Sequence, residues 1–425
     1  MSLSADTNVK FDVVVSGGGL SGLLTAIGLK QETPSLRVAI VEPVEQTSEQ
    51  TVQSNFDQRC LALSHGSLQL LNHWNVWPEL KKNGWPIQTI ITSDRGHVGK
   101  TMMQAKDYGL NAMGHVASMH NLGCALKTTA KNFDLHWFCP DHIVALSSPS
   151  ALSEPVEITL SSGSCIQSQL LVVAEGANSP TRDLLNINNT TSQYQQAAII
   201  ANVRTEAAPE NLNAYGGNVA FERFTTNGPI AFLPIGKSEF NVVWTQSPEQ
   251  ALINKELDDD AFCEALQLAF GYAAGRIVKC SKRAYYPLSL TKVERLIAAR
   301  TVLLGNTAHT VHPIAGQGFN LGVRDIGVLV FEIKQALENN TDIGSFSVLN
   351  SYQKNRLEDI DRITEFTDML VRLFALPGRL PALTRTVGLM SLQKCDSLQQ
   401  WFALHFMGSH KQFSLPQAKT SRVLK

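Results

Sequence analysis

Apolar and polar positions follow two different periods near the N-terminus. Residues 11–15 form a β-branched run, which is typical of a buried parallel strand. A glycine-rich stretch over residues 17–22 follows, and residues 23–29 place Leu and Ile at helical spacing. A second apolar run, residues 38–41, ends at Glu42. This order predicts a strand, a helix and a second strand that carries an acid at its end.

Two further apolar runs enter glycine turns. Residues 170–174 run into Glu175 and Gly176, and residues 301–304 run into Gly305. Beyond the second turn the sequence continues at helical spacing to about residue 372. A glycine-rich turn at the start of a helix offers free backbone N–H groups and the positive end of the helix dipole, so we expect an electron-rich group there. Taken singly, each turn also fits an ordinary strand-to-helix connection.

The middle of the chain has the pattern of an antiparallel sheet. Residues 87–105 predict a hairpin that turns near residues 94–96, and short alternating runs fill residues 194–245. Turn signals such as Asn227-Gly228-Pro229 separate these runs. We therefore predict an α/β chain, α+β overall, in which a Rossmann-like domain carries an inserted antiparallel-sheet domain and a C-terminal helical segment.

Composition narrows the classes of function. The 425-residue chain is long enough for two or three domains, and its formal net charge of −1 argues against a general nucleic-acid binder. The seven cysteines are scattered without a C-x-x-C pair, which fits a reducing cytosol and predicts no metal site or disulfide framework. Residues 1–8 are polar, and no apolar run approaches the roughly 18 residues of a membrane-spanning helix. We expect a cytoplasmic protein, either soluble or attached peripherally at the inner face of the membrane.

The N-terminal glycines predict a dinucleotide site. Gly17 permits the tight turn, Gly19 lets the backbone approach a pyrophosphate, and Gly22 allows the helix to pack closely on the strand. Glu42 lies 20 residues beyond Gly22, where its carboxylate can accept hydrogen bonds from both ribose hydroxyls. Because a carboxylate there repels a 2′-phosphate, we expect NAD or FAD. Arg59 fits either a donor to the cofactor phosphates or a surface residue paired with a neighbouring acid.

Three motifs stand in order along the chain: G-x-G-x-x-G over residues 17–22 with Glu42, A-E-G-x-x-S over residues 174–179, and G-N-x-A-H-x-x-x-P-x-x-G-Q-G-x-N over residues 305–320. Their order and spacing resemble the single-component FAD-dependent aromatic hydroxylases, of which p-hydroxybenzoate hydroxylase has the best-known fold. The resemblance covers nearly the whole chain. Within that family the chain is most similar to the ubiquinone-biosynthesis hydroxylases that act on 2-polyprenyl-6-methoxyphenols. The strings that carry this narrower match are SDRGH at 93–97, FERFT at 221–225, YPL at 286–288 and HPIAGQGFNLG at 312–322.

The resemblance implies chemistry performed by one tightly but non-covalently bound FAD. NAD(P)H would bind transiently and reduce the flavin, and O2 would then give a flavin C4a-hydroperoxide that attacks an electron-rich phenol ring. Pro313 would lie beside the reacting edge of the flavin. His312 would help to handle a phenolic proton, with a hydrogen-bonded loop histidine as the alternative. The resemblance assigns no metal, and it assigns cofactor binding to Gly17, Gly18, Gly19, Leu20, Ser21, Gly22, Glu42, Arg59, Glu175, Gly176, Asn306, Gly316, Gln317, Gly318, Phe319 and Asn320.

Two positions depart from the family's usual pattern. Glu175 and Asn306 both stand where the family usually has Asp, so the first carboxylate is displaced and the second charge-assisted bond is weakened. The methoxyphenol subgroup resembles this chain in having Asn at the second position. The rival interpretations are a sister hydroxylase acting at another ring position, a flavin monooxygenase acting on an unrelated aromatic compound, and a non-catalytic scaffold subunit of a quinone-synthesis complex. The intact glycine motifs argue against a decayed flavin site.

We expect a discontinuous FAD-binding domain over residues 1–86, 106–182 and 289–360, a substrate-binding sheet domain over residues 87–105 and 183–288, and a C-terminal helical segment over residues 361–425. Glu222 and Arg223 lie on one strand of the sheet domain, and alternation lets only one of them face the pocket. The apolar, aromatic and basic tail fits either a contact with an anionic membrane or a partner protein, or a helix pair packed on the FAD domain. Besides the prenylated phenol and O2, the sequence leaves other quinone-biosynthesis proteins and a second copy of the chain open as partners.

Overall fold

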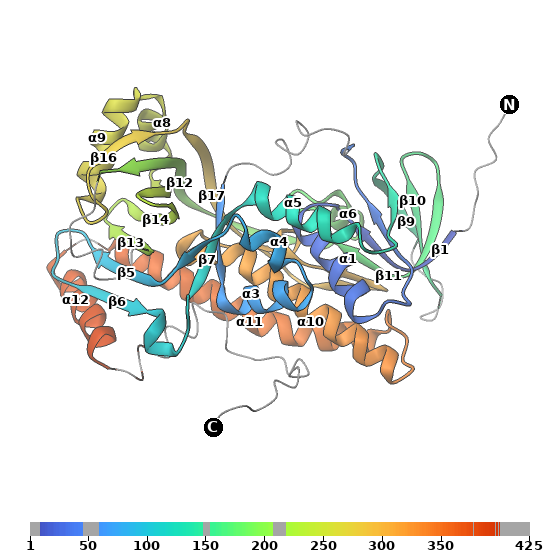
Figure 1. The fold of residues 1–425 in the computed structure, drawn as a ribbon. Helices are drawn as coiled ribbons and strands as arrows, with labels where there is room; N and C mark the ends of the chain where they lie inside the picture. Colours follow the sequence, from blue (N-terminus) through green and yellow to red (C-terminus); the bar gives the residue numbers. More distant parts are fainter. Residues whose placement is uncertain are drawn as a thin grey trace.

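The computed structural model describes residues 9–45, 59–147, 154–206, 218–376 and 378–395, together with residues 397 and 399. Figure 1 shows an elongated molecule, with a βαβ half around α1 and β11 and a second half in which α8 and α9 cover an antiparallel sheet. The long helix α11 (Phe346–Ala375) runs beneath both halves.

The first sheet has the order β18-β19-β11-β1-β2-β8, and a hairpin of β9 and β10 extends it from β11. In this sheet Ser16 lies opposite Val173, and Val173 lies opposite Leu303. The three strands that enter glycine turns are therefore parallel neighbours, and their turns meet at one edge of the sheet. The strands are β1 (Val9–Ser16), β2 (Val38–Val41), β8 (His136–Phe138), β9 (Ile143–Ser147), β10 (Val156–Leu160), β11 (Cys165–Val173), β18 (Ile297–Ala298) and β19 (Thr301–Leu303).

Helices cover this sheet because their apolar faces match its β-branched surface. α1 packs against α5 and α10, and side chains such as Leu23, Leu171 and Leu329 are fully buried between the layers. A three-stranded sheet of order β3-β7-β4 joins this half to the other. The elements are α1 (Leu20–Glu32), β3 (Cys60–Ser64), α3 (His65–His73), α4 (Trp77–Lys81), β4 (Trp85–Ile87), β7 (Gly114–Ser118), α5 (Met119–Ala130), α6 (Pro180–Leu184) and α10 (Gln317–Glu338).

The second sheet has the order β20-β17-β12-β15-β14-β13-β5-β6, with β16 on β12. It has a core of its own, in which the rings of Phe232 and Phe270 stack with centroids 3.8 Å apart. The predicted hairpin forms and joins this sheet because β5 pairs in parallel with β13. The elements are β5 (Thr89–Asp94), β6 (Lys100–Gln104), β12 (Asn189–Thr205), β13 (Val219–Thr225), β14 (Gly228–Gly236), β15 (Glu239–Gln246), α8 (Pro248–Glu256), α9 (Asp259–Phe270), β16 (Ile277–Cys280), β17 (Ala284–Val293) and β20 (His309–Thr310). These layers confirm the predicted fold class.

The C-terminal helices bind the two halves together. α11 packs along α10, and α12 (Arg379–Lys394) packs against β6. The boundary expected at residue 361 falls inside α11, because helical spacing of apolar side chains continues across it. One side of α12 leaves Leu383, Val387 and Met390 exposed. The aromatic and basic end of the tail, beyond residue 400, lies outside the described residues, so its contact with a membrane or a partner stays a prediction.

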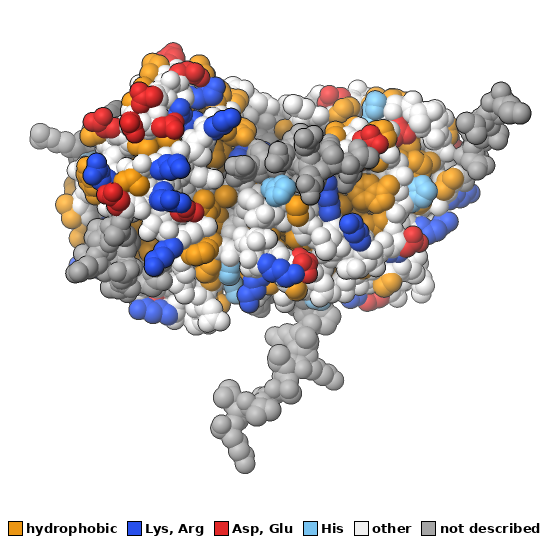
Figure 2. Space-filling model, turned by 45° about the horizontal axis from the view of Figure 1, so that its top comes forward, with side chains coloured by type: hydrophobic (Ala, Val, Ile, Leu, Met, Phe, Trp, Pro, Cys, Tyr) orange, Lys and Arg blue, Asp and Glu red, His pale blue; other side chains and the backbone are white. Residues whose placement is uncertain are grey.

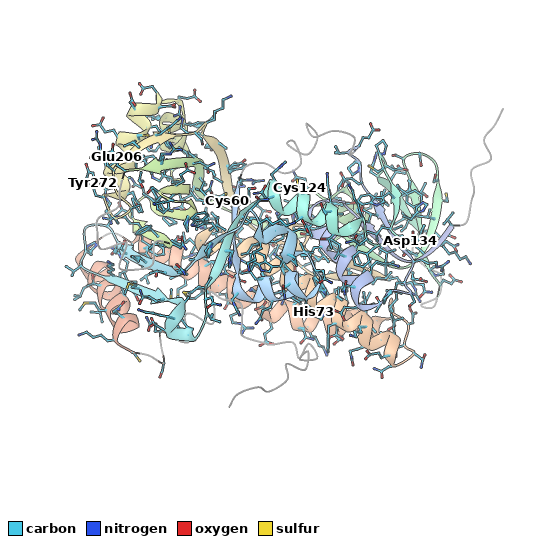
Figure 3. The ribbon with its side chains drawn as sticks, viewed as in Figure 1. Cys60, His73, Cys124, Asp134, Glu206 and Tyr272 are labelled. Atoms are coloured by element: carbon cyan, nitrogen blue, oxygen red, sulfur yellow. The ribbon has the colours of Figure 1, made fainter. Side chains whose placement is uncertain are left out.

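Surface and sulfur chemistry offer few special features. On the face in Figure 2 acidic and basic side chains are intermingled over the end that carries α8 and α9. None of the seven cysteines, all of which the structure describes, forms a disulfide, and Figure 3 labels two of them, Cys60 in the middle of the molecule and Cys124 on α5. Within the described part of the chain, no helix has the length and apolarity needed to cross a bilayer, and no cluster of three metal-ligating side chains occurs.

Candidate active site

A cavity of about 970 Å³ lies where the three glycine turns face the second sheet. Its wall on the βαβ side comes from the β1–α1 turn, the ends of β2 and β11, and the loop before α10. Its opposite wall comes from β12, β13, β14, β15 and β17. Of the sequence-predicted site residues, the cavity brings together Gly17, Gly18, Gly19, Leu20, Ser21, Glu42, Arg59, Glu175, Gly176, Asn306, Pro313, Gly316, Gly318 and Phe319. Gly22, His312, Gln317 and Asn320 do not line it.

The β1–α1 turn needs glycine for three different reasons. Gly17 has φ +104°, in the left-handed region, and a Cβ there would lie 2.6 Å from the carbonyl oxygen of Ala174. A Cβ on Gly22 would lie 1.8 Å from the carbonyl oxygen of Gly17, so glycine alone allows α1 to pack this closely. A Cβ on Gly19 would meet nothing within 4 Å, so this backbone faces open space in the cavity. The turn is therefore a cradle that a bound group can approach closely.

Glu42 and Arg59 provide charge beside this cradle. The Glu42 side chain accepts a hydrogen bond of 2.6 Å at Oε2 from the backbone N–H of Gly18, and a second of 3.1 Å at Oε1 from Val44. These bonds hold the carboxylate at the end of β2, where the Rossmann arrangement places a ribose-binding acid. The Arg59 guanidinium lies 4.5 Å from the centroid of the Tyr286 ring, so it reaches across the cavity towards the second sheet.

Glu175 holds the chain around it through its longer side chain. Its carboxylate accepts hydrogen bonds of 2.5 Å from the hydroxyls of Ser179 and Thr181, a bond of 3.1 Å from the Thr181 N–H, and a short bond from the Ser16 hydroxyl. It thereby ties the end of β1 to the start of α6. The next residue, Gly176, has φ +86° and donates from its N–H to the Thr307 hydroxyl at 3.1 Å.

The loop before α10 contributes backbone and small side chains. Asn306 is exposed to the cavity, and Pro313, Gly316, Gly318 and Phe319 line it. Gly316 has φ +61° and lies directly before the first residue of α10. The positive end of this 22-residue helix therefore faces the cavity, as the glycine pair predicts.

His312 lies behind the loop. It is fully buried; its Nδ1 accepts from the Ile314 N–H at 3.3 Å, and its Nε2 lies 3.2 Å from Gln196 Oε1. Burial lowers the pKa of His312 to about 4, so the ring is neutral at physiological pH. Because it does not reach the cavity, the geometry favours the alternative of a hydrogen-bonded loop histidine over a proton carrier.

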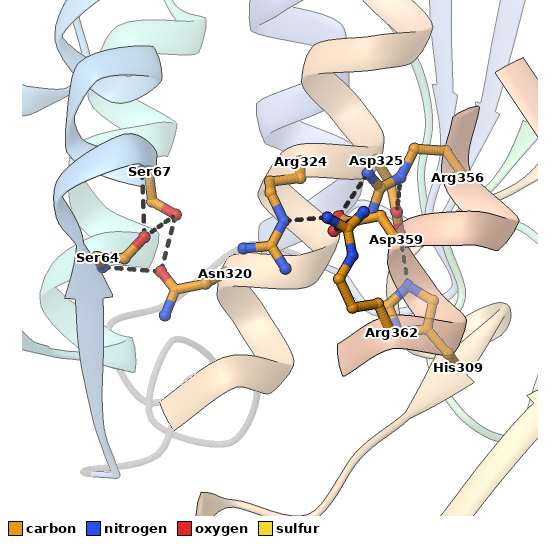
Figure 4. Close-up of polar contacts among 9 residues, drawn as sticks. All are labelled: Ser64, Ser67, His309, Asn320, Arg324, Asp325, Arg356, Asp359 and Arg362. Atoms are coloured by element: carbon orange, nitrogen blue, oxygen red, sulfur yellow. Dashed lines mark hydrogen bonds and ion pairs between the residues drawn. The ribbon is translucent and has the colours of Figure 1, made fainter. Parts of the chain in front are cut away.

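The Asn320 side chain links the start of α10 to the three-stranded sheet and the start of α3 through hydrogen bonds. Its Oδ1 accepts from the Ser64 N–H at 2.9 Å and from the Ser67 hydroxyl at 2.7 Å (Figure 4). Its Nδ2 donates to the carbonyl oxygens of Ala62 and Gly316 at 2.8 and 2.7 Å. All of these partners are protein groups, so Asn320 shapes the loop from behind, and its side chain does not line the cavity.

Asp325 anchors the turn that carries Asn306, a role that the sequence analysis missed. Its carboxylate accepts from the Gly305 N–H at 2.9 Å. It also accepts from His309 Nε2 and from Arg356 Nε, each at 2.7 Å (Figure 4). Burial by itself would raise the pKa of Asp325, but His309 and Arg356 outweigh it and lower the pKa to about 2. The signal available in the sequence was an acid on the apolar face of a predicted helix, one turn beyond Leu321.

The second-sheet wall is mainly apolar, with Glu222 as its carboxylate and Tyr286 and Ser289 as further polar residues. Glu222 lines the cavity, whereas Arg223 points to the other side of β13, near Gly271. The structure thus decides which of the two strand neighbours faces inward. Burial raises the pKa of Glu222 to about 8. The apolar side chains around it are Ile90, Ala198, Ile200, Ala220, Ala231, Leu233 and Val243.

Comparisons with known proteins agree with this architecture. The model of the FAD binding domain family matches residues 10–367. The ubiquinone biosynthesis monooxygenase COQ6 of Homo sapiens, a mitochondrial protein, is 29% identical over 445 residues, covering 93% of this chain and 92% of the relative. The ubiquinone hydroxylase UbiL of Rhodospirillum rubrum is 29% identical over 402 residues, covering 94% of this chain and 90% of the relative. The crystal structure of p-nitrophenol 4-monooxygenase PnpA from Pseudomonas putida superposes with a TM-score of 0.74 at 14% identity, covering 95% of this chain and 100% of that one.

The chain has an FAD-binding fold that it shares with p-nitrophenol 4-monooxygenase. The chain belongs to the FAD binding domain family. The resemblance predicted from the three sequence motifs is therefore confirmed at the level of family and fold, and the relatives place the chain beside the ubiquinone-biosynthesis hydroxylases.

Proposed function

We propose that this protein is an FAD-dependent monooxygenase of ubiquinone biosynthesis that hydroxylates the aromatic ring of a polyprenyl methoxyphenol, using NAD(P)H and O2. The observation that carries the proposal is a single cavity with two unlike walls: a glycine cradle with a ribose-type acid on one side and an apolar sheet on the other. A dinucleotide and an apolar aromatic ring can meet in such a space. The names of the two relatives support the pathway.

The residues of the cradle fit FAD. The open space at Gly19 suits a pyrophosphate, and the carboxylate of Glu42 suits the ribose hydroxyls. The side chain of Asn306 suits a ribitol hydroxyl, and the start of α10 suits negative charge on the ring system. Bound FAD would supply electron transfer and oxygen activation, and the protein would supply position and a dry environment.

The second sheet fits the substrate and excludes water. Its cavity face is built mainly from Ala, Val, Ile and Leu, with Phe221, Tyr286 and Pro287 also lining it, which suits a prenylated ring better than a carboxylated one. Such a wall also keeps water away from a reactive oxygen species, which is the usual requirement for productive hydroxylation. We propose that the substrate unit consists of residues 87–105 and 183–288, and that the FAD unit consists of the three segments expected from the sequence.

Two alternative functions can be weighed against the geometry of the cavity. A sister hydroxylase acting at another ring position would use the same cavity, because ring position depends on how the substrate is oriented on the wall. A decayed scaffold would be expected to have a damaged cradle. The open space at Gly19 and the Glu42 carboxylate held by the Gly18 N–H support an intact one. The cradle therefore favours an enzyme.

The test is a visible spectrum of the purified protein under anaerobic conditions, with NADPH or NADH added before and after a short-chain 2-prenyl-6-methoxyphenol. We expect bound FAD that is released by acid, phenol-stimulated bleaching, and a product heavier by one oxygen atom once air is admitted. A product hydroxylated at a different ring position would support the sister enzyme. A protein that neither contains nor takes up FAD would refute the enzyme and favour the scaffold.

A further inference from the structure

Glu222 lies at one end of the row of strands that forms the apolar wall. It lies on β13, pairs with Ala231 of β14 and lies opposite Thr92 of the parallel strand β5. Across the sheet, Ala231 pairs with Val243, and Val243 pairs with Ile200. Glu222 and the three apolar residues of this row all line the cavity, so the acid is set at one end of a flat apolar row on which a ring can rest.

Glu222 differs from the other cavity carboxylates in its lack of partners. Glu42 accepts from two backbone N–H groups, and the Glu175 carboxylate accepts from three hydroxyls and a backbone N–H. Among the described residues, no hydrogen-bond donor or cation pairs with the Glu222 carboxyl. Enclosed polar groups in proteins normally have a partner, and an unpartnered one facing a cavity points to a ligand group that completes it.

The environment makes Glu222 an unusually strong base for a carboxylate. Burial alone raises its pKa to about 8, with no charged neighbour contributing. A phenol hydroxyl has a pKa of about 10, so Glu222 is far closer to a phenol in proton affinity than an ordinary carboxylate is. Proton transfer is most efficient when the two affinities approach each other and the working pH.

Other ionisable groups around the site are engaged or turned elsewhere. Asp94 on β5 is bonded to Arg385 and His97, and β14 carries no ionisable side chain. α11 contacts β13 and carries Glu365 and the ion pair of Asp368 with Arg372, and its Phe374 stacks on Phe224 of β13. Arg223, near Gly271 on the other side of β13, interacts electrostatically with Arg95 and Asp94. The remaining ionisable groups that line the cavity are Glu42, Arg59, Cys60, Lys127, His142, Glu175 and Tyr286.

We infer that Glu222 is the catalytic residue that binds the hydroxyl of the phenolic substrate and takes its proton; this inference rests on the proposed function. The O–H bond of the phenol breaks, its electron pair stays on the phenol oxygen, and a new O–H bond forms on the Glu222 carboxylate. The oxygen thereby gains negative charge and makes the ring more electron-rich for attack. When the hydroxylated carbon loses its hydrogen to solvent as a proton, the C–H electron pair returns to the ring, the O–H bond of Glu222 breaks, and its proton goes back to the same phenol oxygen. No oxidant or reductant takes part in either transfer.

The test compares holoenzymes carrying Glu222→Gln, Glu222→Leu and Glu239→Gln. Gln keeps a hydrogen-bond acceptor and loses basicity, whereas Leu loses both. Glu239 is the matched control, because it lies on β15 of the same sheet and pairs with Arg204 at the surface. The ligands are a short-chain 2-prenyl-6-methoxyphenol and its O-methyl ether, which has no hydroxyl proton. Infrared difference spectra of the oxidised holoenzymes follow the protonated carboxyl band as the pH is raised.

For Glu222→Gln we expect phenol affinity within about threefold of wild type and kcat lower by about 10²- to 10⁴-fold. In wild type kcat should rise with pH to a plateau above about pH 8, and in Glu222→Gln it should be flat. Glu222→Leu should also lose the preference for the phenol over its methyl ether. The infrared band should titrate near pH 8 in wild type and be missing in both Glu222 variants.

Two kinds of failure can be told apart. If wild type binds no FAD or hydroxylates no phenol, the proposed function fails. If wild type hydroxylates the phenol and Glu222→Gln does so at the same rate with the same pH profile as Glu239→Gln, the inference about Glu222 is overturned and the proposed function stands. An infrared band that titrates as in an ordinary carboxyl would also overturn the inference.

Discussion

Replacing Asp325 by Asn tests whether the buried ion cluster holds the Gly305 turn. The carboxylate accepts three hydrogen bonds, from the Gly305 N–H, from His309 and from Arg356. Asn has the same shape but places an NH2 group where one carboxylate oxygen accepts. At least one buried donor would then face another donor, and the Arg356 charge would lose a partner.

The expected loss is about 3 kcal/mol of unfolding free energy. Breaking a buried ion pair by removing one partner costs about 3–5 kcal/mol, and Asp359 still accepts from Arg356 Nη1 at 2.8 Å, which favours the lower end. The pKa gives a consistent figure. Lowering the pKa of Asp325 from 3.8 to about 2 corresponds to roughly 2.5 kcal/mol, at about 1.4 kcal/mol per pH unit. Because the folded-state pKa is depressed, this stabilisation is complete above about pH 4 and is lost as the pH falls towards 2.

The assay is urea unfolding of the FAD-free protein at neutral pH. The control is Asp361→Asn on α11, which removes the partly exposed ion-pair partner of Lys292. This variant should lose at most about 1 kcal/mol of unfolding free energy. Asp325→Asn should also weaken FAD binding, because the turn that carries Asn306 loses its anchor. A stability within about 0.5 kcal/mol of the Asp361 variant would refute the reasoning.

Three further predictions follow from the same geometry. Gly19→Ala should leave the unfolding midpoint of the FAD-free protein unchanged and weaken FAD binding at least about tenfold. Gly22→Ala should instead destabilise the fold by about 3 kcal/mol or more, because its Cβ would lie 1.8 Å from a carbonyl oxygen. Equal unfolding midpoints for the two variants would contradict this contrast. Arg385→Ala should release α12, because the variant loses a buried ion pair in which Arg385 Nε and Asp94 Oδ2 are 2.9 Å apart. Limited proteolysis should then cut near α12. An unchanged digestion pattern would count against this ion pair as the anchor of α12. His312→Gln should leave the shape of the pH–rate profile unchanged between about pH 6 and pH 8, because the buried ring is already neutral there; loss of a limb in that range would return His312 to the proton-handling role.

The sequence by itself determined the order of elements and the cradle. β-branched runs, helical spacing and glycines are local signals, and Gly17, Gly19 and Gly22 act through backbone geometry that depends on the turn itself. The same holds for Glu42, whose place at the end of β2 follows from the length of one βαβ unit. The hairpin at 87–105 was also visible, but its parallel pairing with β13 was not, because that contact joins segments more than a hundred residues apart.

Only the tertiary structure decided where side chains point. His312 and Asn320 belong to the same motif as Gly316, yet they turn away from the cavity, because their donors and acceptors are satisfied by Gln196, Ile314 and the start of α3. Alternation along β13 could not choose between Glu222 and Arg223, since a strand exposes both faces until a neighbouring layer covers one. Asp325 became an anchor only when α11 brought Arg356 against α10. Local periodicity specifies the backbone, whereas the direction of a side chain depends on which distant partner packs against it.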